Sequence, residues 1–329
     1  MNWNKIDWDA LEHLRGHFLK AEAGRHDYWR TQGDLSAYDQ TFGRRIAWKW
    51  EYVLEALDRR GWRPPVGEVL DWGCGSGVAA RAFAGHFGPG SVSRIVLWDA
   101  SRLAREFATR AVHAEFPAVA AERGTGGEAA EGTWLLSHVI TELLRSELDA
   151  LVARLARATA VVWVEPGTFV ASRALIGVRE RLRERFGIVA PCTHQAACGL
   201  LAPGCERHWC HHFAQTPTDV YMDAGWSRFA RTVGVDLRSL PVSCLVLDRR
   251  PLPPLVPQAK RMIGRPRVDK VGALLFLCDA EGVRDRRLAK RAFPREFRYA
   301  KNERLDTLLA CECDGDEIVK FLPIVPGQE

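Results

Sequence analysis

The spacing of apolar side chains changes once along the chain, near residue 63. Before that point, residues 5–60 have a helical pattern, because apolar positions between Trp48 and Leu57 recur at near-helical spacing and Gly61 ends the run. Beyond it, short apolar runs alternate with longer amphipathic segments. Strands that alternate with helices predict a parallel sheet whose two faces are both covered by helices.

The predicted elements divide the chain into three regions. Strands are expected at residues 67–73, 93–99, 133–139, 158–167, 242–250, 272–280 and 317–325, and helices at 76–87, 101–116, 141–156, 172–186 and 218–234. Ser172 is the expected N-cap of the helix over 172–186. The regions are an N-terminal helical region (1–62), an α/β domain that includes a cysteine-rich loop at 191–213 (63–250), and the last sheet strand or strands with a basic C-terminal region (251–329).

Composition is that of a globular protein. The chain has 329 residues, of which 47% are apolar and 26% charged, and this balance argues against a disordered or collagen-like chain. No apolar run approaches the roughly 18 residues that a membrane helix needs. The first residues carry acids and lack an apolar core, so we expect neither a secretory signal nor a mitochondrial presequence. We predict a cytoplasmic monomer with no membrane partner.

Positive charge is concentrated towards the C-terminal end. Between residues 259 and 304, fourteen Lys and Arg accompany six Asp and Glu, a net charge of +8 in a chain whose total is +5. Such a segment is typical of a surface that binds a polyanion, although a solvated arginine-rich face would give the same count. The helix over 173–185 is an alternative basic surface. The side chains expected to bind RNA phosphates are Arg284, Arg286, Arg287, Lys290 and Arg291.

A glycine-rich loop follows the first predicted strand and opens the next helix. Glycines there allow a tight turn and a close approach to a ligand, and the helix N-terminus offers free amides. The dinucleotide fingerprint would need Gly or Ala at position 78, which is Val78. The spacing is instead that of S-adenosylmethionine (SAM) binding in class I methyltransferases, with an acid at the end of the second strand for the ribose hydroxyls. The alternative is a purely structural glycine turn. The candidate SAM-binding residues are Asp71, Gly73, Gly75, Gly77 and Asp99.

Two side chains at the ends of later strands are candidate proton acceptors. His138 lies at the carboxyl end of the strand expected at 133–139, and Glu165 at that of the next strand, where catalytic groups of such sheets are found. Each could equally make a structural hydrogen bond. Many base-modifying methyltransferases carry an Asn- or Asp-Pro-Pro-aromatic motif at the end of the strand that corresponds to 133–139. That motif is absent here, where the chain reads Ser137-His138-Val139. The sequence therefore leaves catalysis uncertain.

Cysteines cluster in the loop at 191–213, which holds four of the nine. With no export signal we expect reduced thiols, so the cluster points to metal ligation or redox chemistry. The paired spacing of structural zinc sites is missing, whereas irregularly spaced thiolates suit an iron–sulfur cluster. Mixed zinc ligation with His194, His211 and His212 stays open, as do ordinary unliganded thiols. The cysteines of this loop are Cys192, Cys198, Cys205 and Cys210.

From about Tyr38 to Asp306 the chain resembles the methyltransferase-like mitochondrial ribosomal small-subunit assembly factors and their bacterial relatives. The segments that carry the resemblance are Pro191-Cys192, His194, Cys198, Trp209-Cys210-His211, Arg265-Pro266-Arg267, Leu277-Cys278-Asp279 and Gly282, together with Glu165-Pro166-Gly167-Thr168 and the loop that begins at Asp71. The chain departs from the family at Thr193 and Gly199, where proline is usual, and Cys205 is an extra candidate ligand.

The resemblance implies a class I SAM-dependent methyltransferase (Rossmann-like) fold with an N-terminal helical segment, a cysteine-rich metal-binding insertion and a small basic C-terminal region. It implies association with small-subunit ribosomal RNA. It also implies a [4Fe–4S] cluster, with zinc as the alternative, on Cys192, Cys198, Cys210 and Cys278. We therefore expect a SAM-binding protein of this fold that acts on the ribosomal small subunit in assembly or translation. The alternatives are an active rRNA methyltransferase and a redox-sensing RNA-binding protein.

Overall fold

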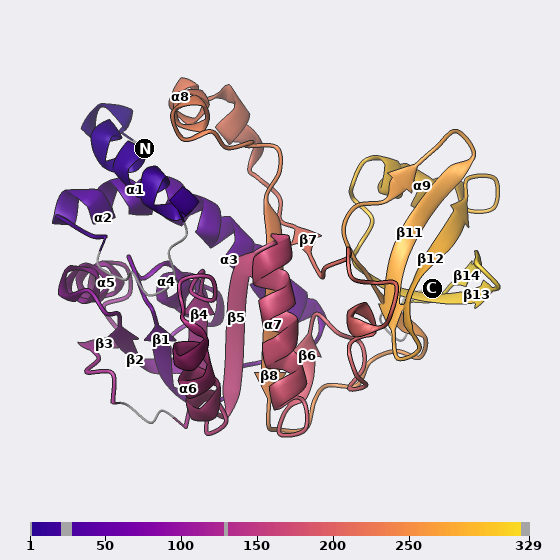
Figure 1. Cartoon of the computed structure of the whole chain (residues 1–329), viewed down its shortest axis with the longest axis horizontal. Helices are drawn as coiled ribbons and strands as arrows, with labels where there is room; N and C mark the ends of the chain where they lie inside the picture. The colour runs from indigo at the N-terminus through magenta and orange to yellow at the C-terminus, as the bar shows by residue number, and fades with distance from the viewer. Residues whose placement is uncertain (1, 21–27, 128–130, 324–329) are drawn as a thin grey trace.

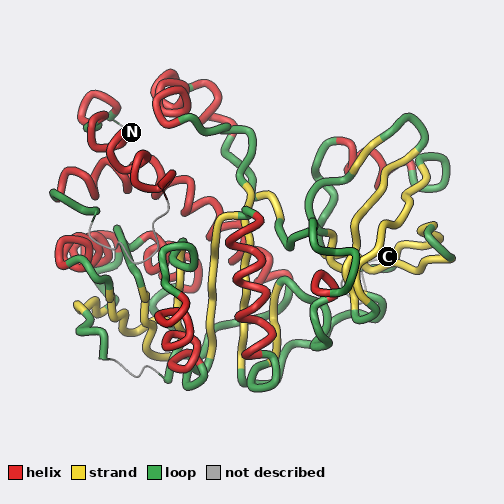
Figure 2. The backbone as a smooth tube through the Cα atoms, in the orientation of Figure 1, coloured by secondary structure: helices red, strands yellow, loops and turns green. Residues whose placement is uncertain are grey.

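The computed structural model describes residues 2–20, 28–127 and 131–323. Within these ranges the strands form two sheets, shown side by side in Figure 1 and as a backbone tube in Figure 2. The N-terminal region is helical, as the apolar spacing predicts. Its elements are η1 (Trp3–Lys5), α1 (Trp8–Lys20), α2 (Gln32–Tyr38), the π-helical η2 (Asp39–Gly43) and α3 (Arg44–Arg59).

The first sheet has the strand order β3-β2-β1-β4-β5-β8-β6, with β7 paired to β8. Strands β1 to β5 run parallel, whereas β8 lies antiparallel between β5 and β6. This order, with a single reversed strand beside β5, is the class I methyltransferase fold expected from the sequence. The strands are β1 (Gly67–Trp72), β2 (Val92–Trp98), β3 (Ala120–Arg123), β4 (Thr133–Ser137), β5 (Ala160–Pro166), β6 (Gly187–Ala190), β7 (His212–Phe213) and β8 (Pro241–Asp248).

Both faces of this sheet are buried, as the predicted alternation of strands and helices requires. Along β5, Val162 and Val164 pack in one apolar cluster with side chains of α3, α4 and α5. Val161 and Trp163 point to the opposite face and pack with side chains of α6 and α7. The helices and short turns of this part are α4 (Val78–Phe87), α5 (Arg102–Glu115), α6 (Arg145–Leu155), α7 (Phe169–Leu182), η3 (Gly199–Leu201), η4 (Thr218–Met222) and α8 (Ala224–Val233).

Helix α7 begins three residues before the predicted start. Thr168 is its N-cap, because the Thr168 hydroxyl accepts a hydrogen bond from the Ala171 amide at 3.3 Å. The predicted cap at Ser172 is therefore wrong: this residue lies inside α7, and its hydroxyl donates to the Cys210 carbonyl at 2.7 Å. The earlier start places Phe169 and Val170, both exposed, in the first turn of the helix.

The strands between Ala259 and Phe321 form a second sheet rather than extending the first. Its order is β10-β11-β12-β14-β13-β9, and β9 also pairs with β11, so five of these strands close into a small barrel. The barrel has its own apolar core, which includes Leu275, Leu288 and Ile318. Its elements are β9 (Ala259–Met262), β10 (Arg267–Val268), β11 (Gly272–Asp279), β12 (Gly282–Ala289), α9 (Pro294–Lys301), β13 (Leu308–Asp314) and β14 (Glu317–Phe321).

The barrel has the strand connectivity of an OB-fold. When β9, β11, β12, β13 and β14 are numbered 1 to 5, the strands of the barrel close in the order 1-2-3-5-4-1, a Greek-key arrangement. All neighbours are antiparallel except β12 and β14, the third and fifth strands, which are parallel. Helix α9 lies between the third and fourth strands. In Figure 1 the barrel lies beyond the β6 side of the first sheet, and the segment that carries η3 and β7 passes between the two.

Candidate functional site

The three glycines of the loop after β1 have different physical roles, although all have positive φ angles. A Cβ atom on Gly73 would lie 2.5 Å from a Val139 methyl, and one on Gly77 would lie 3.0 Å from the Ala108 Cβ. These two glycines allow close packing within the protein. A Cβ on Gly75 would meet no described heavy atom within 4 Å. Gly75 is therefore the glycine that borders open space where a ligand could approach.

The two acids assigned to this loop also differ. Asp71 is completely buried, and its carboxylate accepts a hydrogen bond from the Ala80 amide at 3.1 Å, which ties β1 to the first turn of α4. Burial raises the pKa of Asp71 to about 7. Asp99 instead accepts hydrogen bonds from the amides of Gly75 and Ser101, both at 2.9 Å. The structure thus brings Asp99 to the glycine loop and gives Asp71 a structural contact.

A third acid, Glu142, interacts with Asp99 through its charge and was not singled out from the sequence. Burial, and then the charges of Asp99 and Glu165, raise the pKa of Glu142 to about 8. The Tyr28 hydroxyl donates to the Glu142 carboxylate at 3.4 Å. Two neighbouring carboxylates favour a cationic or hydrogen-bond-donating ligand, because such a ligand relieves their repulsion. Glu142 follows no recognisable motif, so only its position after β4 could have indicated it.

Glu165 holds the end of β4 in place. It is completely buried, and one carboxylate oxygen accepts hydrogen bonds from the amides of Val139 and Ile140 and from the Trp163 indole, at 3.0, 2.9 and 2.6 Å. Burial raises the pKa of Glu165 to about 7. Of its two predicted roles, the structural hydrogen bond is the one that the geometry displays.

His138 meets a lysine that comes from the N-terminal region. Its backbone has a φ of 58°, rare for a residue with a side chain, and its Nε2 lies 3.4 Å from the Lys49 Nζ. Lys49 is only 7% exposed, and burial lowers its pKa to about 7. Burial, and then the Lys49 charge, lowers the pKa of His138. Lys49 stands between Trp48 and Trp50 in the sequence of α3. It was missed because a lysine side chain in a helix is usually expected to face solvent.

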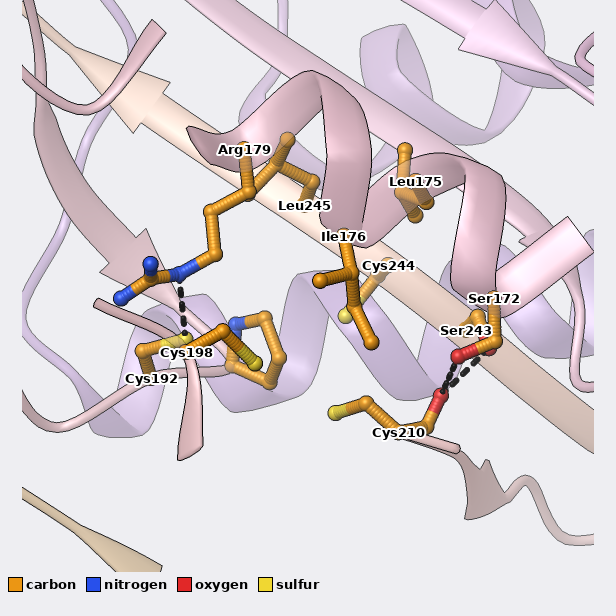
Figure 3. Close-up of a pocket in the computed structure, with 11 residues that line it drawn as sticks. Ser172, Leu175, Ile176, Arg179, Cys192, Cys198, Cys210, Ser243, Cys244 and Leu245 are labelled. Atoms are coloured by element: carbon orange, nitrogen blue, oxygen red, sulfur yellow. Dashed lines mark hydrogen bonds between the residues drawn. The ribbon is translucent and has the colours of Figure 1, made fainter. Parts of the chain in front are cut away.

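The cysteine-rich loop contributes three thiols to one pocket, shown in Figure 3. Apolar side chains of α7 form one wall, and β8 supplies Cys244, which the sequence analysis had not grouped with the cluster. Cys205 is not among the lining residues, whereas Cys210 is. The pocket is lined by Ser172, Leu175, Ile176, Arg179, Pro191, Cys192, Cys198, Cys210, Ser243, Cys244 and Leu245.

Cys278 approaches the same thiols from β11 of the barrel. It packs in one apolar cluster with Cys198 and Cys210, and its sulfur lies 3.7 Å from the His194 Nε2. The backbones also meet here, because a Cβ on Gly199 would lie 2.7 Å from the Gly282 Cα. The four predicted ligands thus gather where the loop crosses between the first sheet and the barrel.

A buried guanidinium accompanies the thiols. Arg179 is 2% exposed, its Nε donates to the Cys192 sulfur at 3.3 Å, and its Nη2 donates to the Ala196 carbonyl at 2.8 Å. Burial and the neighbouring sulfurs raise the pKa of Cys210 and Cys278. In the described ranges, no group of three or more Cys, His, Asp or Glu side chains is arranged to hold a metal ion.

The basic residues expected to bind RNA occupy unequal positions on β12 and after it. Arg286 is only 8% exposed, and its guanidinium donates to the Gly315 carbonyl, so the prediction that it faces a phosphate is wrong. It points inward because alternate residues of β12 face the barrel core. Arg284 and Arg287 pair with Glu281 and Asp269 at 3.5 and 3.0 Å. The other two residues of the set, Lys290 and Arg291, are both exposed.

None of the helices in the described part of the chain is both long enough and apolar enough to cross a membrane.

The structural role of Glu165 can be tested by pH-dependent unfolding of E165Q and E165A. Because the folded carboxyl keeps its proton up to about pH 7, wild-type stability should fall between pH 5 and pH 8. The E165Q protein retains the acceptor oxygen and lacks this penalty. Its free energy of unfolding relative to wild type should therefore rise over that interval, by at most about 3 kcal/mol at about 1.4 kcal/mol per pKa unit.

The E165A protein loses the acceptor for three donors and should be destabilised by more than about 2 kcal/mol at both pH values. Urea titrations of the three proteins at pH 5 and pH 8 make the comparison. Equal stability of E165A and wild type would show that Glu165 does not hold the end of β4.

Solved methyltransferase structures superpose only weakly on the structure of this chain. Magnesium protoporphyrin IX methyltransferase from Synechocystis PCC 6803, with bound SAH, has 12% identity and a TM-score of 0.40, covering 74% of this chain and 100% of that one. A SAM-dependent methyltransferase from Thiobacillus denitrificans has 14% identity and a TM-score of 0.34, covering 61% and 91%. The strand order described above, rather than these scores, carries the fold.

No curated protein matches the sequence. The family profile described as mitochondrial small ribosomal subunit Rsm22 matches residues 50–306. This match extends from α3 to the end of the loop before β13, so it spans the methyltransferase sheet, the cysteine-rich loop and most of the barrel. It agrees with the resemblance seen in the sequence. The chain belongs to the Rsm22 family.

Proposed function

We propose that this chain acts on the ribosomal small subunit, in its assembly or in translation, and contacts small-subunit ribosomal RNA. The observation that carries the proposal is membership of the Rsm22 family over residues 50–306, because the family description names the mitochondrial small ribosomal subunit. A net charge of +8 between residues 259 and 304 supports a polyanionic partner. A cytoplasmic location and a monomeric state stay predictions from the sequence.

Sedimentation with purified small subunits tests this proposal directly. The protein should pellet with isolated small subunits and not with large subunits, and the bound fraction should fall as salt rises, because phosphate contacts release counterions. Equal pelleting with both subunits would indicate non-specific charge attraction and would contradict a small-subunit role.

We also propose that the glycine loop binds SAM. Gly75 borders open space, its amide donates to the Asp99 carboxylate, and the charges of Asp99 and Glu142 interact. SAM carries ribose hydroxyls, a sulfonium and an ammonium group, all of which suit an acidic site. Asp99 would accept the ribose hydroxyls, Glu142 would face the positive charge, and the Gly75 backbone would allow close approach. Of the remaining candidates, Gly73, Gly77 and Asp71 would shape the loop.

The thiols suit a metal group in chemistry and in number. Cys192, Cys198, Cys210 and Cys278 would hold a [4Fe–4S] cluster or a zinc ion, and Arg179 would offset the negative charge of the thiolates. Ligation would join the cysteine-rich loop to the barrel. What supports this proposal is the convergence of four thiols, three from the cysteine-rich loop and one from the barrel, on one buried region.

Methyl transfer is a second candidate function. A buried lysine whose pKa is lowered to about 7 lies against His138 at the carboxyl end of β4, where class I enzymes act on their substrates. Groups with strongly shifted pKa values gather at functional sites more often than elsewhere. Transfer of a labelled methyl group to purified small subunits, compared between wild type and K49M, tests this candidate.

Replacement of Asp99 should weaken SAM binding. The D99A protein loses an acceptor beside Gly75, which should cost about 1–3 kcal/mol of binding free energy in titration calorimetry. Because Asp99 also accepts two backbone hydrogen bonds, the thermal midpoint of each protein should be measured in parallel. D149A, which changes an exposed acid on α6, should bind like wild type. Absence of heat from wild type at millimolar SAM would contradict the site.

Replacement of the barrel cysteine should remove the metal. In anaerobically purified protein, C278S should lose the iron, the labile sulfide and the broad visible absorbance of a cluster. The matched control is C311S, because Cys311 is completely buried in the barrel core. C205S should retain the metal as well. If C205S bleaches the protein and C210S does not, the third ligand is wrongly assigned. If the wild-type protein holds one zinc per chain and no iron or sulfide, the metal is zinc rather than a cluster.

A further inference from the structure

A continuous row of aromatic and cationic side chains runs across the surface beside the thiol pocket. Phe169 meets Trp209 edge-on with ring centres 5.8 Å apart, and Trp209 stacks on His211 at 4.6 Å. His211 meets Phe213 at 5.4 Å. An arginine closes each end, with Arg173 5.8 Å from the Phe169 ring centre and Arg265 4.0 Å from that of Phe213. We call these six residues the aromatic row.

Alternation along residues 209–213 separates the row from the thiols. Trp209, His211 and Phe213 belong to the row, whereas Cys210 lines the thiol pocket and His212 is buried. Successive side chains of an extended segment point to opposite sides, so this short stretch faces two ways. The position of the row is therefore fixed by the same backbone that places Cys210.

The row joins the edge of the first sheet to a specific loop of the barrel. Phe169 follows β5, at the carboxyl edge where the glycine loop also lies. Arg265 lies in the connection between β9 and β11, which is the first loop of the OB-like barrel. The Gly264 amide donates to the His211 carbonyl at 2.8 Å, and its φ of 69° with no side chain lets the His211 ring lie close. OB-folds bind oligonucleotides with this loop and the neighbouring strands.

Exposure and charge fit a single-stranded nucleic acid. Phe169 is 43% exposed and Val170 is 67% exposed, so the row does not end in a packed core. Arg265 is exposed and pairs with Glu303 at 2.9 Å, and Arg207 is exposed nearby in sequence. Single-strand sites combine aromatic rings, on which bases stack, with arginines that hold the backbone. Cations at both ends of a row of rings complement phosphates at both ends of a short stack of bases.

We propose that the aromatic row is a stacking surface for single-stranded RNA, with a base on the exposed Phe169 ring and flanking phosphates on Arg173 and Arg265. This rests on the proposed action on the small subunit, and it specifies which part of the surface takes unpaired RNA. The strand would run from the carboxyl edge of the methyltransferase sheet to the first loop of the barrel.

The test is fluorescence anisotropy of a labelled twelve-nucleotide oligouridine with the full chain and its variants. F169A should bind about 5- to 150-fold more weakly, the range for loss of one stacked base, and F169W should restore binding. R265Q should reduce the log–log salt slope by about 0.7. Y221A is the matched control, because Tyr221 is 44% exposed and lies outside the row, and it should bind like wild type.

Three outcomes would overturn the proposal. They are an unchanged affinity of F169A for oligouridine, a loss of F169A affinity for a duplex of the same length that equals its loss for oligouridine, and no binding of wild type to oligouridine. Thermal midpoints equal to that of wild type show that the variants are folded. Because the probe is a free oligonucleotide, failure here is distinct from failure of small-subunit sedimentation, which tests the proposed function itself. Loss of subunit binding in F169A with unchanged oligouridine binding would assign the row to a protein contact instead.

Discussion

The cysteine-rich loop links the first sheet to the barrel, because its backbone is held by contacts on both sides. The Cys210 carbonyl accepts hydrogen bonds from the hydroxyls of Ser172 on α7 and Ser243 on β8, each at 2.7 Å. On the other side, Gly199 and Gly282 bring the loop and the barrel into direct backbone contact. A segment with little regular structure is thereby placed within narrow limits, and so are the thiols and rings that it carries.

The carboxyl edge of the first sheet shows how the N-terminal region completes a methyltransferase fold. Helix α3 supplies Lys49 to His138, and its Trp50 indole donates to the Ser137 hydroxyl at 2.9 Å. At this edge a base-modifying enzyme would carry its proline-containing clamp, and this chain carries none. The end of β4 is instead held by Glu165 from below and by α3 from the N-terminal side. Asp99 and Glu142 make this part of the edge acidic, which suits the cationic ligand proposed above.

Much of the first sheet could be predicted from the sequence, and little of the barrel. The apolar runs that became β1, β2, β4 and β5 are buried on both faces, so their composition alone identifies them. Strand β3 has the sequence Ala-Ala-Glu-Arg at an exposed edge and offers no such signal. The barrel closes through pairing of β9 with β13, and such distant pairing leaves no local pattern. The inward turn of Arg286 follows from that closure and was missed with it.

The candidate site divides in the same way. Gly75 and Asp99 could be named from the spacing of the loop, and Cys192, Cys198 and Cys210 from the clustering of cysteines along the chain, whereas Cys278 was named through the family resemblance. Lys49 and Glu142 could not, since each becomes notable only when a distant element buries it. The separate roles of Gly73, Gly75 and Gly77 depend on what stands opposite each one, which the glycine pattern does not encode.

The position of the reversed strand β8 determines the order in which parts of this protein can fold during synthesis. Within the described strands β6 pairs with β8, which is synthesised more than fifty positions later, so the edge that precedes the cysteine-rich loop has no partner until β8 emerges. Domains generally fold from the N-terminus as the ribosome produces them. The loop that carries Cys192, Cys198 and Cys210 is therefore left unanchored during synthesis, and Cys278 arrives only with the barrel. Any metal centre on these four thiols would be one of the last features of the nascent chain to form.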